Sequence, residues 1–205
     1  YDGSTPPKVT RTLTGSGPET WYHNHQTTGI ADLVGNVNEW VAGLRLVNGE
    51  IQIIPYSDAL KSSVNMGEAS TEWKAILFAD GSLVEPGTAG TVKFDGKTAS
   101  SGLCLNNQIV NSTGETYFTE PFNSLAVAGG SGLTIPAILY ALGLAPIAGN
   151  TYAGTVYVNN NVAERLPFRG GSYNYASNAG LGCLNLGNPR SYSYDYLGFR
   201  SALFE

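Results

Sequence analysis

The sequence predicts a single α+β domain, residues 1–205, built from turns and short strands. Its 205 residues, of which 42% are hydrophobic, are enough for one sizeable core. The 26 glycines and many asparagines favour turns and short strands over long helices. One block near the N-terminus combines helix-like and strand-like spacing of apolar residues, which accounts for the mixed class.

Composition restricts the partners of the chain. Charged residues make up 13% of the sequence, and the net charge is −5. This balance gives no electrostatic reason to bind nucleic acid or an anionic membrane, so we expect neither as a partner. The most apolar segment, Leu133–Gly149, is interrupted by Pro136 and Pro146 and is too short to span a membrane. It predicts a short buried helix and no direct membrane insertion.

The first 28 residues are polar and predict extended chain or loop. His23 and His25 would lie on one side of an extended segment. A metal-binding pair and a surface loop are both open here, and no third ligand lies nearby in the sequence. No targeting signal is visible, and the start at Tyr1 suggests a chain trimmed at its N-terminus.

Gly29–Ile54 predicts a short helix or tight turn followed by a β-hairpin. Apolar residues first recur at helix-like spacing and then alternate around Asn48-Gly49, a strong hairpin signal. The helix-like positions are Ile30, Leu33, Val34, Val37, Trp40 and Val41. Trp40 is expected in the core.

Residues 55–165 read as an irregular insertion. Within it, Thr71–Gly87 predicts two strands around an Asp80-Gly81 turn, and Thr88–Ala99 predicts the same around Asp95-Gly96. Thr155–Val158 predicts one further strand. The only cysteines, Cys104 and Cys183, could form a disulfide or remain two free buried thiols.

Near the C-terminus, tyrosine and small polar residues alternate over Ser191–Tyr196. As a strand, this run would place three tyrosines on one face. Those tyrosines could be buried, each needing a hydroxyl partner, or exposed as a binding face. The flanking residues look structural: Arg169 and Arg200 are expected to hold carbonyls or carboxylates by forked hydrogen bonds, and Phe199 is expected in the core.

Three motifs together resemble one family. GIADLVGNVNEW, then RGGS, then GFRSAL are similar to the formylglycine-generating-enzyme subtype of the C-type lectin fold. Residues 169–203 resemble the variable region of target proteins of diversity-generating retroelements. The resemblance covers Thr20–Ile54 and Pro167–Leu203, and it implies a C-type lectin-like α+β fold with a long irregular insertion.

The resemblance also implies which residues vary. In that family a reverse transcriptase copies a template repeat and scrambles its adenines, so Asn codons become many other residues. Four asparagines, at 174, 178, 185 and 188, could be varied sites or scaffold. By this likeness the varied, ligand-binding positions are Tyr173, Tyr175, Ala176, Gly182, Cys183, Gly187, Tyr192, Tyr194, Asp195 and Tyr196.

A calcium site is a further implication of the resemblance, although no cofactor is required. Asp32 and Glu39 would supply carboxylates, and Gly35 and Val37 would supply carbonyls, which suit Ca²⁺. The alternative is that Asp32 caps a turn and Glu39 pairs with an arginine such as Arg200.

We therefore expect a diversified ligand- or receptor-binding protein and no catalysis. Its partner would be a protein or glycan on another cell or virion surface, and homo-oligomers occur among such proteins. They sit on phage or viral tails or on prokaryotic cell surfaces. Two alternatives are a formylglycine-generating-type cysteine oxidase, which needs Cys104 near Cys183, and a sugar-binding lectin of fixed specificity.

Overall fold

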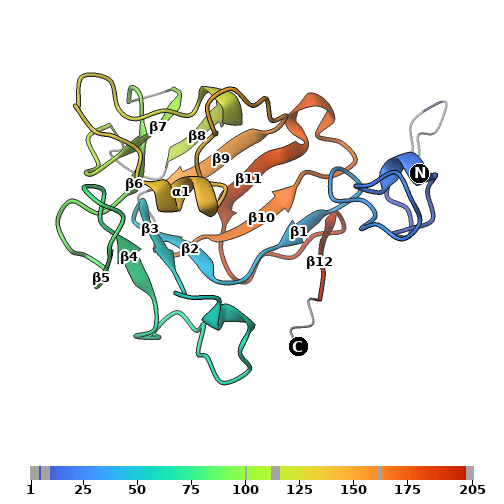
Figure 1. Ribbon diagram of the computed structural model, residues 1–205, viewed down its shortest axis with the longest axis horizontal. Helices are drawn as coiled ribbons and strands as arrows, with labels where there is room; N and C mark the ends of the chain where they lie inside the picture. The colour runs from blue at the N-terminus through green and yellow to red at the C-terminus, as the bar shows by residue number, and fades with distance from the viewer. Residues whose placement is uncertain (1–4, 6–9, 100, 112–115, 161–162, 202–205) are drawn as a thin grey trace.

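The computed structural model describes residue 5 and residues 10–99, 101–111, 116–160 and 163–201. Over these residues the molecule is rich in β-structure, with two six-stranded sheets that share one hydrophobic core. Figure 1 shows the strands of the first sheet side by side across the molecule, in the spatial order β12, β1, β10, β11, β9 and β8.

The first sheet pairs a strand from the first quarter of the chain with strands from its C-terminal part. Its order is β12-β1-β10-β11-β9-β8, with parallel pairing of β1 to β12 and of β11 to β9. Both segments that carry the family resemblance therefore lie in adjacent strands. The bounds are β1 Asn38–Trp40, β8 Thr116–Pro121, β9 Thr155–Asn160, β10 Leu166–Gly170, β11 Gly180–Asn188 and β12 Leu197–Phe199.

The second sheet begins with the predicted hairpin, which is confirmed. Asn48 and Gly49 both have positive φ angles, of 48° and 80°, as the tight turn between β2 and β3 requires. The rest of this sheet comes from the segment predicted as an irregular insertion. The bounds are β2 Leu44–Val47, β3 Glu50–Ile53, β4 Lys74–Ile76, β5 Leu83–Val84, β6 Lys93–Gly96 and β7 Leu103–Asn106.

The block before Gly43, predicted as a short helix or a tight turn, contains no helix: the backbone turns at Asp32, Gly35 and Asn36, all of which have positive φ. One local prediction is wrong. Asp95-Gly96 is part of β6 and pairs with β7, so it is not a turn. The buried Asp95 carboxylate instead accepts hydrogen bonds from the backbone amides of residues 110 and 111.

The apolar segment does contain the short helix that its composition predicted. This helix, α1, spans Ala137–Ala141 and buries Leu139. The remaining helical turns are single 3-10 turns, η1 Glu19–Trp21, η2 Asp58–Leu60, η3 Phe122–Ser124 and η4 Ala176–Asn178.

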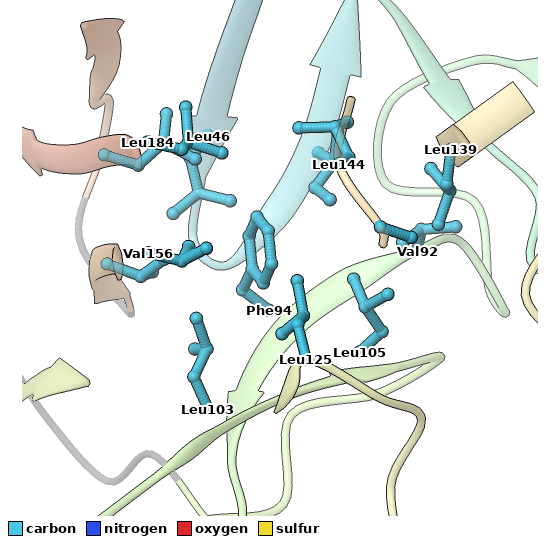
Figure 2. Close-up of a cluster of buried hydrophobic side chains, with 14 of the residues drawn as sticks. Leu46, Val92, Phe94, Leu103, Leu105, Leu125, Leu139, Leu144, Val156 and Leu184 are labelled. Atoms are coloured by element: carbon cyan, nitrogen blue, oxygen red, sulfur yellow. The ribbon is translucent and has the colours of Figure 1, made fainter. Parts of the chain in front are cut away.

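The core lies between the two sheets. Phe94 of β6 lies at the centre of the cluster in Figure 2, among Leu46, Leu184 and Val156. Because these side chains come from the hairpin, the insertion segment and the variable region, residues 55–165 are packed into the same core as both chain ends. This shared core gives the opposite face of the first sheet a rigid support.

Candidate functional site

The tyrosine run lies in a loop, Pro189–Tyr196, and not in the strand that its alternation predicted. The Tyr192 amide donates to the Pro189 carbonyl (3.0 Å), and the Leu197 amide donates to the Tyr194 carbonyl (3.2 Å). Turns therefore open and close this segment, which we call the tyrosine loop. It carries the chain from β11 in the middle of the sheet to β12 at the edge, and an extended strand beside β11 would find both neighbouring positions filled.

The tyrosines nevertheless gather into one stack. The Trp40 ring meets Phe168 edge to face, with centroids 5.3 Å apart. Phe168 stacks on Tyr192 at 6.3 Å, and Tyr192 stacks on Tyr194 at 6.2 Å. Tyr196 lies 4.4 Å from Tyr194. We call these five rings the aromatic column; it runs from the fully buried Phe168 to Tyr194, which is 57% exposed.

Hydrogen bonds fix the phenol groups beside this column. The hydroxyls of Tyr192 and Tyr196 are 2.8 Å apart, and the Tyr175 hydroxyl accepts a long hydrogen bond from the Asn185 amide (3.5 Å). Tyr175 also packs against Tyr157 of β9, with centroids 5.9 Å apart. Burial raises the pKa of Tyr175 and, together with the hydrogen bond between the hydroxyls of Tyr196 and Tyr192, the pKa of Tyr196. These phenols stay neutral hydrogen-bonding groups at physiological pH.

The ten positions predicted to vary fall into three groups by exposure. The exposed positions are Ala176, Tyr194 and Asp195. The half-buried positions are Tyr173, Tyr175, Tyr192 and Tyr196. The buried positions are Gly182, Cys183 and Gly187.

The buried positions lie on β11 and face opposite sides of the sheet. A Cβ atom at Gly182 would meet Phe122 of the shared core at 2.6 Å. Gly187 lies on the other side, where a Cβ would approach the Tyr117 ring at 3.4 Å. Burial raises the pKa of the half-buried Tyr157, and the charge of a Cys183 thiolate would raise it further.

The variable region also exposes residues outside the predicted set, and two of them, Asn174 and Leu181, line hollows of the surface. Asn174 lines a shallow hollow together with Tyr173, Tyr194, Asp195 and Tyr196, which we call the tyrosine hollow. Leu181, at the start of β11, is 65% exposed. The strand alternation of β11, read from Gly180 onwards, is the signal that could have pointed to Leu181.

Ion pairs hold the tyrosine loop on both sides. Before the run, Arg190 donates two hydrogen bonds of 3.0 Å to the Glu164 carboxylate. After it, Arg200 makes a forked pair with Glu39 of β1, at 3.0 and 2.6 Å. Within the run, the exposed Asp195 pairs with an arginine of the N-terminal segment at 3.1 Å. The loop is therefore a fixed platform, and its rings lose little further freedom on contact with a ligand.

Glu164 is the most embedded of these anchors. It is 6% exposed and accepts hydrogen bonds from both Arg190 and Arg45. The Arg45 guanidinium lies 4.5 Å from the centre of the Trp73 ring and also donates to Gln52 (2.8 Å). One buried carboxylate thus connects the tyrosine loop to the hairpin β2–β3.

The predicted roles of the two scaffold arginines are confirmed. Arg200 holds a carboxylate, as described, and Arg169 donates to the carbonyls of Leu142 and Gly143 at 3.2 Å each, just beyond helix α1. Phe199 is not in the core as predicted: it is 80% exposed, because β12 lies at the edge of the sheet. Residues 202 and 203 of the predicted variable region lie outside the described residues.

The predicted calcium ligands take the alternative arrangement. Both oxygens of Glu39 accept hydrogen bonds from Arg200, and Asp32 accepts one from a backbone amide of the N-terminal segment (2.9 Å). The hydrogen bond to Glu39 and the charge of Asp32 raise the pKa of Arg200. This guanidinium supplies the positive charge that calcium would bring, so Asp32, Gly35, Val37 and Glu39 do not fit an ion site in this conformation.

The other residues considered as metal ligands or catalytic groups do not form a site. Within the described part of the chain, no three His, Cys, Asp or Glu side chains form a cluster suited to a metal ion. His23 accepts a hydrogen bond from the Ile30 amide through Nδ1 at 2.8 Å, as part of a surface turn. Cys104 and Cys183 are both free and buried, and lie in different sheets.

Comparison with known proteins adds no relative. No family model matches the chain. A search of curated proteins likewise found no match. The function is therefore inferred from the geometry of the site.

Proposed function

We propose that this protein recognises a macromolecular ligand through a changeable surface formed by its C-terminal tyrosines. The observation that carries this proposal is the aromatic column, which presents partly exposed tyrosines on a loop held by Glu164 and Glu39. Tyrosine provides a large contact area with few rotatable bonds, which suits a binding surface. The exposed residues of the tyrosine loop, Tyr194 and Asp195, can be replaced by other residues without disturbing the core.

A C-type lectin-like scaffold of the formylglycine-generating-enzyme subtype is part of this proposal. Its support is that the two resembling segments, Thr20–Ile54 and Pro167–Leu203, contribute the adjacent strands β12, β1, β10 and β11. Residues between the motifs contribute the second sheet, which packs behind the site. In this arrangement a stable core carries a surface loop that can vary, which is how binding loops are commonly positioned.

The burial of both thiols favours recognition over the oxidase alternative. Burial raises the pKa of Cys104 and of Cys183 to about 11 each, so neither forms the thiolate that such chemistry requires at neutral pH. The lectin of fixed specificity is disfavoured by Arg200, which occupies the carboxylate that would bind calcium.

We expect both thiols to resist labelling by a disulfide reagent in the native protein and to react after unfolding. In the unfolded chain they ionise near pH 9, whereas in the folded protein they keep their protons until about pH 11. The unfolded state therefore releases protons first, and the free energy of unfolding should fall as pH rises through this window, by about 1.4 kcal/mol per pH unit for each thiol. Chemical denaturation across this pH range measures the slope.

A variant with Cys104→Ala and Cys183→Ala is the control, and its slope should be shallower. Rapid labelling of either thiol in the folded protein would contradict this expectation and would revive the oxidase alternative.

The proposed partner is a protein or glycan on another cell or on a virion, and the proposed location is a viral tail or a prokaryotic cell surface. Within the described residues, no helix is both long and apolar enough to cross a membrane. A neighbouring reverse-transcriptase gene and a near-copy of the codons for residues 169–203 would support the diversification part of the proposal.

A pair of displayed libraries tests the recognition surface. The first library randomises Tyr173, Ala176, Tyr194 and Asp195. The second randomises four exposed residues that are distant from the variable region in the sequence, namely Ser62, Ser63, Thr71 and Glu72. Both are selected against the same panel of unrelated folded proteins. We expect specific binders from the first library at a frequency at least about tenfold higher than from the second. Equal frequencies would overturn the proposal.

A further inference from the structure

A second hollow adjoins the tyrosine hollow, because Tyr173 lines both. One wall of the second hollow is the variable region, through Ala176 and Leu181, and the other is the segment Thr10–Asn36. We call it the N-terminal cleft. Figure 1 shows this N-terminal segment (blue) beside the connection between β10 and β11 (orange).

The wall formed by the N-terminal segment is held in place by its own hydrogen bonds. The Asp32 amide donates to the Trp21 carbonyl (3.0 Å), and the Tyr22 hydroxyl donates to the Gly15 carbonyl (2.9 Å). The Asn36 side chain both accepts from and donates to the backbone of residue 12, at 2.9 and 3.1 Å. The cleft is therefore formed before any ligand arrives.

Apolar side chains that are exposed to solvent meet at this cleft. Trp21 is 46% exposed, and its ring lies so close to Gly17 that a Cβ there would overlap it. Val34 and Leu181 are also large, exposed apolar residues, and both line the cleft. Exposed apolar side chains that cluster in a concavity, with a tryptophan among them, are typical of protein-binding sites.

The cleft offers little charge to a ligand. None of the described residues that line it is Lys, Arg or Glu. The single carboxylate, Asp32, is buried and already accepts a hydrogen bond from the Gly15 amide. Apart from His23 and His25, the lining offers no further side chain that could pair with a charged group of a ligand, so the cleft favours a neutral, apolar occupant.

Strained backbone is concentrated around the same cleft. Among the described residues, seven other than glycine have positive φ, and four of these line the cleft: His25, Asp32, Asn36 and Ala176. Such conformations cost free energy and persist at binding sites where the surrounding structure enforces them.

We propose that the N-terminal cleft binds apolar side chains of a protein ligand and forms a constant half of the recognition surface beside the variable half. The identity of that ligand rests on the proposed function. Trp21 and Val34 would make contacts common to every version of the protein, and the varied Tyr173 and Ala176 would adjust the shared border. A protein ligand is favoured over a glycan because most of the surface that the walls expose to the cleft is apolar.

The test uses small probes, so its result does not depend on the natural ligand. N-acetyl-phenylalanine amide and N-acetyl-leucine amide are titrated into the isotope-labelled protein, and the indole N–H resonance of Trp21 is followed by NMR. A Trp21→Phe variant assigns that resonance. We expect it to shift with a Kd on the order of 1 mM, as is usual for such small ligands. N-acetyl-serine amide and methyl glucoside should produce no shift.

Two variants make the test specific to the cleft. Leu181→Asp places a charge on the wall of the cleft and should weaken probe binding at least about tenfold, whereas Thr71→Asp adds the same charge at an exposed residue that does not line the cleft and should leave binding unchanged. The proposal is overturned if neither apolar amide shifts the resonance or if methyl glucoside shifts it equally. Loss of the library result with probe binding intact would instead reject the proposed function alone.

Discussion

Replacing Gly182 with tyrosine is expected to unfold the domain, whereas Leu181→Tyr is expected to leave it folded. The two residues are adjacent on β11 but face opposite sides of the sheet. A Cβ at Gly182 would lie 2.6 Å from the ring and 2.7 Å from the Cβ of Phe122, whose side chain is packed in the core. Leu181 is exposed and has room for a ring. We expect a loss of at least about 3 kcal/mol for the first variant and less than about 0.5 kcal/mol for the second.

Thermal and urea unfolding, followed by circular dichroism, measure both variants. Gly182→Ala is the milder companion: a single methyl group forces Phe122 to shift and should cost about 1–3 kcal/mol. A folded Gly182→Tyr variant with unchanged stability would show that β11 or Phe122 can move aside.

This prediction divides the positions that the family likeness marks as varied. Tyr194, Asp195 and Ala176 are exposed and can accept many residues, whereas Gly182 can accept few. We therefore expect natural variants to keep a small residue at Gly182 even where its codon can change. Sequencing many copies of the variable region from one population would measure this directly.

The local turn signals predicted part of the fold because they act through neighbouring residues. Asn48-Gly49 and Asp80-Gly81 form the turns that their sequence favours, and the Asp80 side chain accepts a hydrogen bond from the Ser82 amide. The strand at Thr155–Val158 is also present, as part of β9.

Two departures from the sequence pattern share one cause, which is a contact with a distant segment. The helix-like block ends in β1 because β1 is hydrogen-bonded to both β10 and β12, which come from the C-terminal part of the chain. Asp95-Gly96 has the composition of a turn but pairs with β7. Spacing along the chain contains no information about such partners.

The candidate site was predictable in composition but not in arrangement. Alternation over Ser191–Tyr196 predicted tyrosines on one face, and they do stack together, although in a loop. Their order depends on the buried Phe168 and on Trp40, which was expected in the core but is half-buried. The N-terminal cleft was not predicted, because it forms between segments more than a hundred residues apart in the sequence.

Replacing Glu164 with glutamine is expected to cost about 3–5 kcal/mol and to release the tyrosine loop. The variant has nearly the same shape but leaves Arg45 buried with an uncompensated charge. Burial already lowers the pKa of Arg45 despite its bond to Glu164, which shows how far this guanidinium is removed from water. Urea unfolding measures the loss of stability, and hydrogen exchange over residues 189–197 measures the release of the loop.

Glu120→Gln is the matched control. Glu120 is also a buried carboxylate in an ion pair, with Lys97 at 2.7 Å, but Lys97 is largely exposed and the pair does not touch the tyrosine loop. Loss of the Glu120–Lys97 ion pair should lower the free energy of unfolding by about 1 kcal/mol and leave hydrogen exchange in residues 189–197 unchanged. Faster exchange in both variants would mean that the loop responds to global stability alone.

Arg190→Gln separates the anchoring of the loop from the stability of the core. It removes the loop's two hydrogen bonds to Glu164 and leaves Arg45 paired with that carboxylate, so stability should change by less than about 1 kcal/mol. Exchange in residues 189–197 should nevertheless accelerate, because Arg190 is the last fixed contact before Tyr192. Unchanged exchange in this variant would show that stacking on Phe168 is enough to hold the tyrosines, and that Glu164 serves the core only.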